Sequence, residues 1–176
     1  RDYGGWGIYP DQGSHDLLIQ NNLVYHCQDG ALFAHHNRDI TAENNIFALN
    51  RHTQVERYGI GGFELTCRRN LVYYQEGTAL GSSGVENSGT NVCVFDQNLY
   101  WNASGQPVLF GDKTFAQWQA GGQDKNSIVA DPLFVDPTRG DFMLRPGSPA
   151  VKVGFEPWDL TTAGPRSGVR VAPTNP

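Results

Sequence analysis

Four segments of the chain repeat one pattern, and this repeat limits the possible fold more than any other feature. Each segment has a short apolar or β-branched run, a polar step, an asparagine, and then apolar residues with an aromatic ring. The asparagines are Asn22, Asn45, Asn70 and Asn98, with spacings of 45 − 22 = 23, 70 − 45 = 25 and 98 − 70 = 28 residues. A repeat of roughly 20–30 residues with strands in each unit is typical of a solenoid, whose units bury their apolar faces only by stacking.

The repeat predicts an all-β fold, a right-handed parallel β-helix. We expect the asparagines to stack into a ladder, because an amide both donates and accepts and because asparagine tolerates the left-handed backbone of a tight turn. One domain is expected over residues 1–160, followed by an extended Pro- and Gly-rich tail over 161–176. The only predicted helix spans residues 114–120, where Thr114 and Gln117 form a capping box and Gly121 ends the helix.

Composition excludes several classes of partner. The net charge is −5 and no basic stripe occurs, which argues against nucleic acid. No apolar run reaches the roughly 18 residues of a membrane span. The cysteines Cys27, Cys67 and Cys93 lack metal-ligand spacing and are interpreted as inert, buried thiols. A metal site built from histidines of several coils was considered, but no local motif supports it, so we predict no metal and no cofactor.

The beginning of the sequence shows no capping helix, no signal peptide and no initiator methionine. We interpret the chain as a mature or truncated product, the back part of a longer solenoid. A solenoid needs capped ends, and an uncapped first coil favours association with another chain. The sequence therefore predicts a homo-oligomer formed through the N-terminal coil.

Two stretches interrupt the repeat and are predicted to be loops. Residues 50–62 form an insertion that ends in three glycines, and residues 81–90 are rich in Gly, Ser and Asn. Extra residues between the coils of a solenoid form loops on one face, often the binding face.

Residues 126–154 resemble the closing segment of bacterial right-handed β-helix proteins. They read Asn-Ser-Ile-Val-Ala-Asp-Pro-Leu-Phe-Val-Asp-Pro-Thr-Arg-Gly-Asp-Phe-Met-Leu-Arg-Pro-Gly-Ser-Pro-Ala-Val-Lys-Val-Gly. Those proteins are mostly extracellular and act on polysaccharides. The resemblance implies a secreted or periplasmic protein with an oligosaccharide or polysaccharide partner. It does not choose the reaction, since the fold hosts hydrolases, lyases, esterases and epimerases.

A second resemblance lies near the start of the chain. Gly7-Ile-Tyr-Pro-Asp11, with Leu32-Phe-Ala-His-His36 one coil later, is similar to a β-helix glycoside hydrolase family of β-xylosidases. In that family a Gly-Ile-x-x-Asp motif supplies the nucleophile, which Asp11 matches, and a glutamate one coil further supplies the acid/base. Counting 11 + 23 = 34 leads to Ala34, so the expected glutamate is absent.

Spacing by one coil points to histidine as the replacement. Adjacent coils are about 4.8 Å apart, so a residue near 34–36 lies beside Asp11. Neighbouring strand residues face opposite sides, so only one of the two histidines can join Asp11, and we favour His35. The predicted catalytic residues are Asp11, His35 and Glu56, with Glu64 as another substitute carboxylate. The predicted substrate-binding residues are Arg57, His36, Tyr9, Tyr58 and His52. Trp6, Tyr73 and Tyr74 are further candidates for a sugar-stacking platform, although alternation places some of these aromatic residues in the core.

Three hypotheses remain open at the level of sequence. The first is glycoside hydrolysis with Asp11 at the site. The second is a carbohydrate-binding or structural β-helix without activity, in which Asp11 only caps backbone amides of its turn. The third is a carbohydrate esterase, in which Asp11 and Arg57 supply two of the parts. A lyase is disfavoured because it needs a basic cluster and lysines are scarce.

Overall fold

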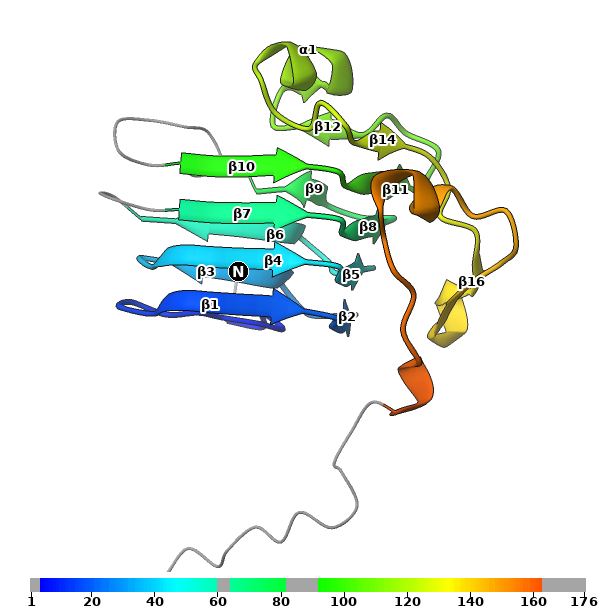
Figure 1. The fold of residues 1–176 in the computed structure, drawn as a ribbon, viewed down its shortest axis with the longest axis horizontal. Helices are drawn as coiled ribbons and strands as arrows, with labels where there is room; N and C mark the ends of the chain where they lie inside the picture. Colours follow the sequence, from blue (N-terminus) through cyan, green and yellow to red (C-terminus); the bar gives the residue numbers. More distant parts are fainter. Residues whose placement is uncertain (1–3, 60–63, 82–91, 163–176) are drawn as a thin grey trace, which may run out of the picture.

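The computed structural model describes residues 4–59, 64–81 and 92–162 and shows a parallel β-solenoid (Figure 1). Its strands form three stacks that run the length of the molecule, and each pass of the chain adds one strand to each stack. The predicted β-helix is thus confirmed. The predicted tail falls mainly on residues 163–176, which lie outside the described residues.

The strands are grouped here by sheet. The first sheet contains β1 (His15–Gln20), β4 (Arg38–Glu43), β7 (Glu64–Arg68) and β10 (Val92–Asp96). The second contains β2 (Leu23–Tyr25), β5 (Ile46–Ala48), β8 (Leu71–Tyr74), β11 (Leu99–Asn102) and β14 (Ile128–Val129). The third contains β3 (Gly30–His35), β6 (Thr53–Tyr58), β9 (Thr78–Leu80), β12 (Leu109–Phe110) and β13 (Lys113–Thr114). The first coil lacks a third-sheet strand, but Ile8 bridges Leu32 in parallel register at that place.

The predicted asparagine ladder is present at the turn between the first and second sheets. Asn45 Oδ1 accepts bonds from the backbone amide and Nδ2 of Asn22, at 2.9 and 3.0 Å. Asn70 Oδ1 accepts the same pair from Asn45, and Asn98 Oδ1 accepts the pair from Asn70. The ladder therefore satisfies buried polar groups at the one corner where the coils have no sheet bonds.

The conformational reason given for asparagine was wrong in one respect. The left-handed residue of this turn is the one before each ladder asparagine, with φ between 54° and 56° at Asn21, Asn44, Arg69 and Gln97. Since arginine and glutamine also occupy this position, the ladder depends on the amide side chain and not on the backbone tolerance of asparagine.

The core fills the inside of the coils. In the first sheet, Ile40, Leu65 and Cys93 face inward and stack on one another, and none is more than 1% exposed. Cys67 and Cys93 are buried thiols as predicted, whereas Cys27 is only partly buried.

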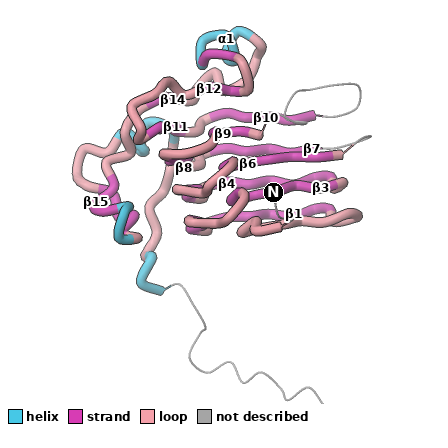
Figure 2. The backbone as a smooth tube through the Cα atoms, turned by 180° about the vertical axis from the view of Figure 1, so that it is seen from behind, coloured by secondary structure: helices cyan, strands magenta, loops and turns pink. Residues whose placement is uncertain are grey.

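The predicted insertion at residues 50–62 was wrong. Thr53 to Tyr58 form β6, a regular strand that pairs in parallel with β3 and β9. Figure 2 shows this strand stacked with the others of its sheet. The predicted loop at residues 81–90 falls almost wholly outside the described residues.

The end of the solenoid beyond β11 is closed. β13 turns back antiparallel to β12, and α1 (Phe115–Ala120) follows directly, with the predicted capping box between Thr114 and Gln117. Beneath the helix, the fully buried Asp124 accepts bonds from Trp118 Nε1 and Ser127 Oγ and from Asn98 Nδ2, so it ends the asparagine ladder. No helix in the described part of the chain is long and apolar enough to cross a membrane.

The segment after β14 folds back along the outer face of the second sheet (Figure 1). It contains the antiparallel pair β15 (Phe134–Asp136) and β16 (Asp141–Leu144) and the short 3₁₀ helices η1 (Pro137–Arg139), η2 (Pro149–Val153) and η3 (Leu160–Thr162). Phe134, Phe142 and Phe155 pack there against outward-facing Ile46 and Leu71, forming a second apolar core outside the coils. Asn44 ties the segment down by two hydrogen bonds of 2.8 Å to the backbone of Glu156.

Candidate functional site

Asp11 and His35 form a direct pair on the surface of the third sheet. Asp11 Oδ1 lies 2.9 Å from His35 Nδ1, and it also accepts bonds from the Tyr9 hydroxyl at 3.2 Å and the Gln12 amide at 2.7 Å. An ionised carboxylate only accepts, so the proton in the short contact belongs to His35 Nδ1. This leaves His35 Nε2 as the ring nitrogen that can exchange a proton with a bound molecule.

The register explains why histidine, and not Ala34, faces Asp11. Ile8 pairs with Leu32, so the offset at this sheet is 32 − 8 = 24 residues and Asp11 aligns with His35. The count of 23 holds in the first sheet, where Leu17 pairs with Ile40. The connection from the third to the first sheet is therefore one residue longer in the first coil. Ala34 faces the interior and is fully buried.

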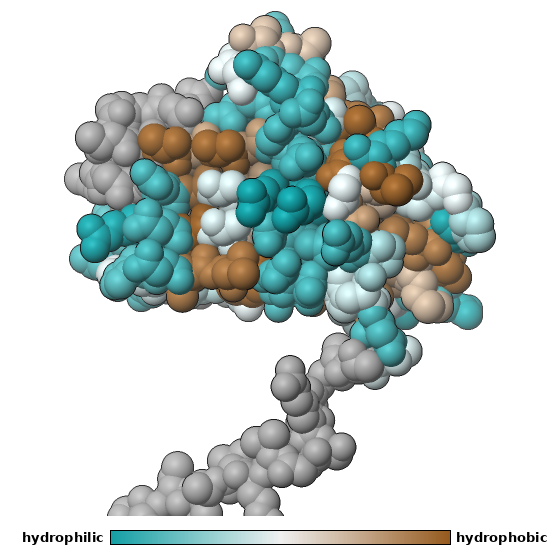
Figure 3. Space-filling model, in the orientation of Figure 1, coloured by the Kyte–Doolittle hydropathy of each residue, from teal (hydrophilic) through white to brown (hydrophobic). Residues whose placement is uncertain are grey.

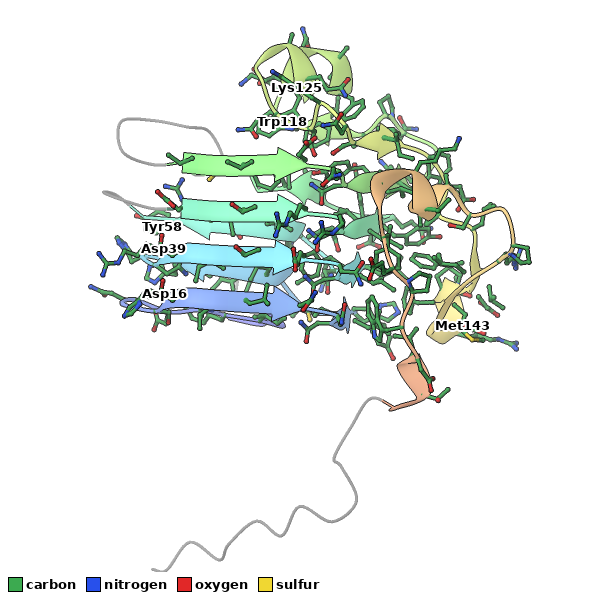
Figure 4. All side chains as sticks on the ribbon, viewed as in Figure 1. Asp16, Asp39, Tyr58, Trp118, Lys125 and Met143 are labelled. Atoms are coloured by element: carbon green, nitrogen blue, oxygen red, sulfur yellow. The ribbon has the colours of Figure 1, made fainter. Side chains whose placement is uncertain are left out.

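Aromatic rings surround the pair. Phe33 stacks on Trp6 and Tyr9, with ring centroids 4.4 and 5.2 Å apart. Tyr58, one coil above His35, lies nearly parallel to the imidazole at 5.7 Å and is 54% exposed. Figure 4 shows Tyr58 at the end of the strands where Asp16 and Asp39 also lie. Rings of this kind, with one exposed face, are suited to stacking against sugar rings.

Phe33 was missed by the sequence reasoning, although a signal was available. It follows from aligning Tyr9 with Phe33 once the offset of 24 is used. Tyr73 and Tyr74 do not join this face, since Tyr74 is in the interior and Tyr73 packs against Phe134 beneath the C-terminal segment.

His36 remains close to the pair, contrary to the expectation from strand alternation. β3 ends at His35, and His36 adopts a left-handed φ of 46°, so its side chain is not turned into the core. Its ring meets His35 edge-on at 4.5 Å and Tyr58 at 5.7 Å.

Arg57 does not reach this face, so its prediction as a surface-binding residue was wrong. Its position on β6 alternates inward, level with Ala34, and the residue is 1% exposed. The guanidinium Nη1 lies 3.3 Å from Cys93 Sγ inside the coil. A substrate on the Asp11 face cannot contact it without unfolding the strand.

Three other predicted residues lie apart from Asp11. Glu56 faces outward next to Phe33, but its side chain lies over Gly81 of the next coil, on the side away from Asp11. His52 precedes the first residue of β6, about 20 Å along the strand from Tyr58. Glu64 begins β7 on the first sheet. The structure therefore brings together Asp11, His35, His36, Tyr9 and Tyr58, but not Glu56, Arg57 or His52.

The electrostatics favour an ionised Asp11. The hydrogen bond from His35 is the largest cause that holds the pKa of the Asp11 carboxyl below its usual value of 3.8, and the Gln12 amide adds to it. Among the described residues, no three His, Cys, Asp or Glu side chains gather as metal ligands would. The chemistry that the pair can perform is proton transfer through an oriented imidazole.

The fold places the chain among parallel β-helix repeat proteins. No protein-family model matches it, and no solved structure matches it either. The chain is 27% identical over 199 aligned positions to the "Uncharacterized protein YwoF" of Bacillus subtilis (strain 168), an alignment that covers 85% of this chain and 41% of that protein. The chain thus spans less than half of this relative, whose name states no activity.

Proposed function

We propose that the protein is a carbohydrate-active β-helix protein that hydrolyses glycosidic bonds of an oligosaccharide or polysaccharide at the Asp11–His35 face. The observation that carries the proposal is the 2.9 Å contact between Asp11 Oδ1 and His35 Nδ1 within a row of aromatic rings. In this proposal Tyr58 and Tyr9 stack on sugar rings beside the pair. A secreted or periplasmic location belongs to the same proposal, since polysaccharides are found there.

The two residues have different roles in the proposed reaction. Asp11 holds the imidazole with Nδ1 protonated, and His35 Nε2 removes a proton from the attacking water, as an oriented general base does. Retaining glycosidases instead use two carboxyl groups about 5–5.5 Å apart, and inverting enzymes use two at about 6.5–9.5 Å. Because Asp11 bonds directly to His35 and Glu56 leans away, water activated by histidine fits this site better than attack by Asp11.

A carbohydrate esterase is a second candidate, and the same dyad favours it. Attack of water on an ester carbonyl needs a base first, and an imidazole held by a carboxylate supplies one. The buried Arg57 takes no part in this version.

The bond class is tested by incubating the full chain with aryl glycosides, aryl esters and plant polysaccharides, with His35→Gln in parallel. We expect product from the wild type and a loss of about 10²- to 10⁴-fold in the variant, because glutamine can bond to Asp11 but cannot transfer the proton. Aryl glycoside products support glycoside hydrolysis, and aryl ester products alone support the esterase. Sugar binding without turnover by the folded wild type would leave only a binding role and contradict both reactions.

A further inference from the structure

The first coil leaves the bottom layer of the core open. Leu17 aligns with Ile40 in the inward-facing stack, yet Leu17 is 39% exposed and Ile40 only 1%. Leu18 on the same strand is 59% exposed, and Figure 3 shows an apolar patch over β1 at this edge. The opposite end of the solenoid is closed by β13 and α1.

The asparagine ladder also ends incomplete at this edge. Asn45 Nδ2 donates to the Ile19 carbonyl of the coil below, and Asn70 Nδ2 donates to Ala42 in the same way. Asn22 Nδ2 instead bonds to Gln20 O of its own coil. Asn22 Oδ1 occupies the place where each higher asparagine accepts two bonds, and no donor from the described residues reaches it.

The backbone at the edge has a matching donor. In the second sheet Ile46 N donates to Asn22 O, and Leu71 N donates to Asn45 O. By the same register, Leu23 N is directed away from the solenoid at the open edge. Asn22 Oδ1 and Leu23 N together present the pattern that every coil presents to the coil before it.

The C-terminal segment extends past this edge. Figure 1 shows the segment running beyond β2, with η3 below the level of the first coil. Between them lies a groove of about 820 Å³, lined by Asn22, Leu23 and Tyr25 on one side and by Met143, Trp158 and Leu160 on the other. The groove continues, below the first coil, the space in which the C-terminal segment covers the second sheet.

We propose that this open edge is the docking site of one further β-coil, in continuous polypeptide with the first coil and parallel to it. The coil carries an asparagine below Asn22, whose backbone amide and Nδ2 donate to Asn22 Oδ1. Its apolar side chains cover Leu17, and its second-sheet strand lies in the groove against Trp158. Main-chain pairing supplies the affinity, and the asparagine sets the register.

A second copy of the chain fits this edge less well. A copy related by a two-fold axis presents the same edge, so its chain circulates in the opposite sense and its three segments cannot all run parallel to those of the first coil. Its Asn22 would bring a second acceptor to the first. A head-to-tail copy would have to approach with its other end, which β13 and α1 close.

The test is a full chain in which residues 1–5 are replaced by a copy of residues 30–52, so that a second-coil sequence precedes Trp6 in register. We expect hydrogen exchange to show protection of the Leu23 amide and of the copied strands, with a rise in Tm of at least about 4 °C. The matched control carries Asn45→Ala in the copied segment only, and we expect it to lose most of this protection.

Four outcomes would overturn the proposal. The copied strands might exchange as an unfolded peptide does, or the control might be protected as well as the parent extension. The extension might also remove protection from β7 and β8, showing that a coil at this edge disrupts the fold. Finally, light scattering might show the unextended chain to be a dimer with its Leu23 amide already protected, which would assign the edge to a second copy.

Discussion

The Asp11 carboxylate shows how one residue is prepared by its neighbours. His35 is the largest cause of its lowered pKa, so we expect the carboxyl of Asp11 to titrate below 3.8 by NMR and to move back towards 3.8 in His35→Ala. The sign for stability follows from this direction. The contribution is present above the unfolded pKa and is lost as the pH falls through the folded pKa. An unchanged midpoint in His35→Ala would contradict the pairing.

Asp124 has the opposite environment. Burial raises the pKa of its carboxyl above 3.8, while the bonds from Ser127 and Trp118 oppose the shift. Its contribution to stability is therefore complete below 3.8 and is lost as the pH rises through the folded pKa. We expect urea unfolding of the wild type to show this decline and Asp124→Asn to lack it. Equal pH dependence in the two proteins would exclude Asp124 as its source.

The sequence predicted the site only in part at this scale. Asp11 and His35 were predicted because one coil of spacing brings them together, whichever way the exact register falls. Arg57 was misplaced because a charged side chain is expected at the surface, whereas here it takes an inward position beside Cys93. The inward or outward direction of one residue depends on register, and the Asn spacing gave that register wrongly for the third sheet.

At the scale of the element, the ladder is strongest in its interior rungs. Asn70→Ala removes the acceptor used by Asn45 and the donor to Ala42, all in buried surroundings, so we expect a loss of about 2–4 kcal/mol. Asn22→Ala at the open edge is the matched control and should cost about 1 kcal/mol. Chemical denaturation measures both, and equal losses would contradict a ladder that gains strength from burial.

The strands differed in how well the sequence predicted them. The first and second sheets were predicted because each ladder asparagine marks the turn between them. β6 was taken for a loop because Thr-Gln-Val-Glu-Arg-Tyr lacks an apolar alternation, and one of its inward positions is an arginine. Parallel pairing with β3 and β9 overrides this weak local signal, since tertiary contacts decide strand formation.

At the scale of the whole molecule, the C-terminal segment holds the second sheet. Phe142 contacts the rings of Tyr25 and Phe134 and is 1% exposed. We expect Phe142→Ala to cost about 3–5 kcal/mol and to increase hydrogen exchange in β15 and β16 before β7. Met143→Ala is the control, since Met143 is 54% exposed. Uniform loosening of all coils would show that the segment is not a separate unit.

The central claim is that the Asp11–His35 pair is a reactive site because of its surroundings, and one comparison tests it. Asp16 is also an exposed aspartate bonded to a histidine, with His15 Nδ1 2.6 Å from its Oδ2, but it lies outside the aromatic row. The measurement is the hydrolysis rate of Asp11→Asn and of Asp16→Asn on the best substrate of the panel. We predict a loss of at least about 100-fold for Asp11→Asn and a wild-type rate for Asp16→Asn. Equal rates in the two variants would contradict the assignment of the site.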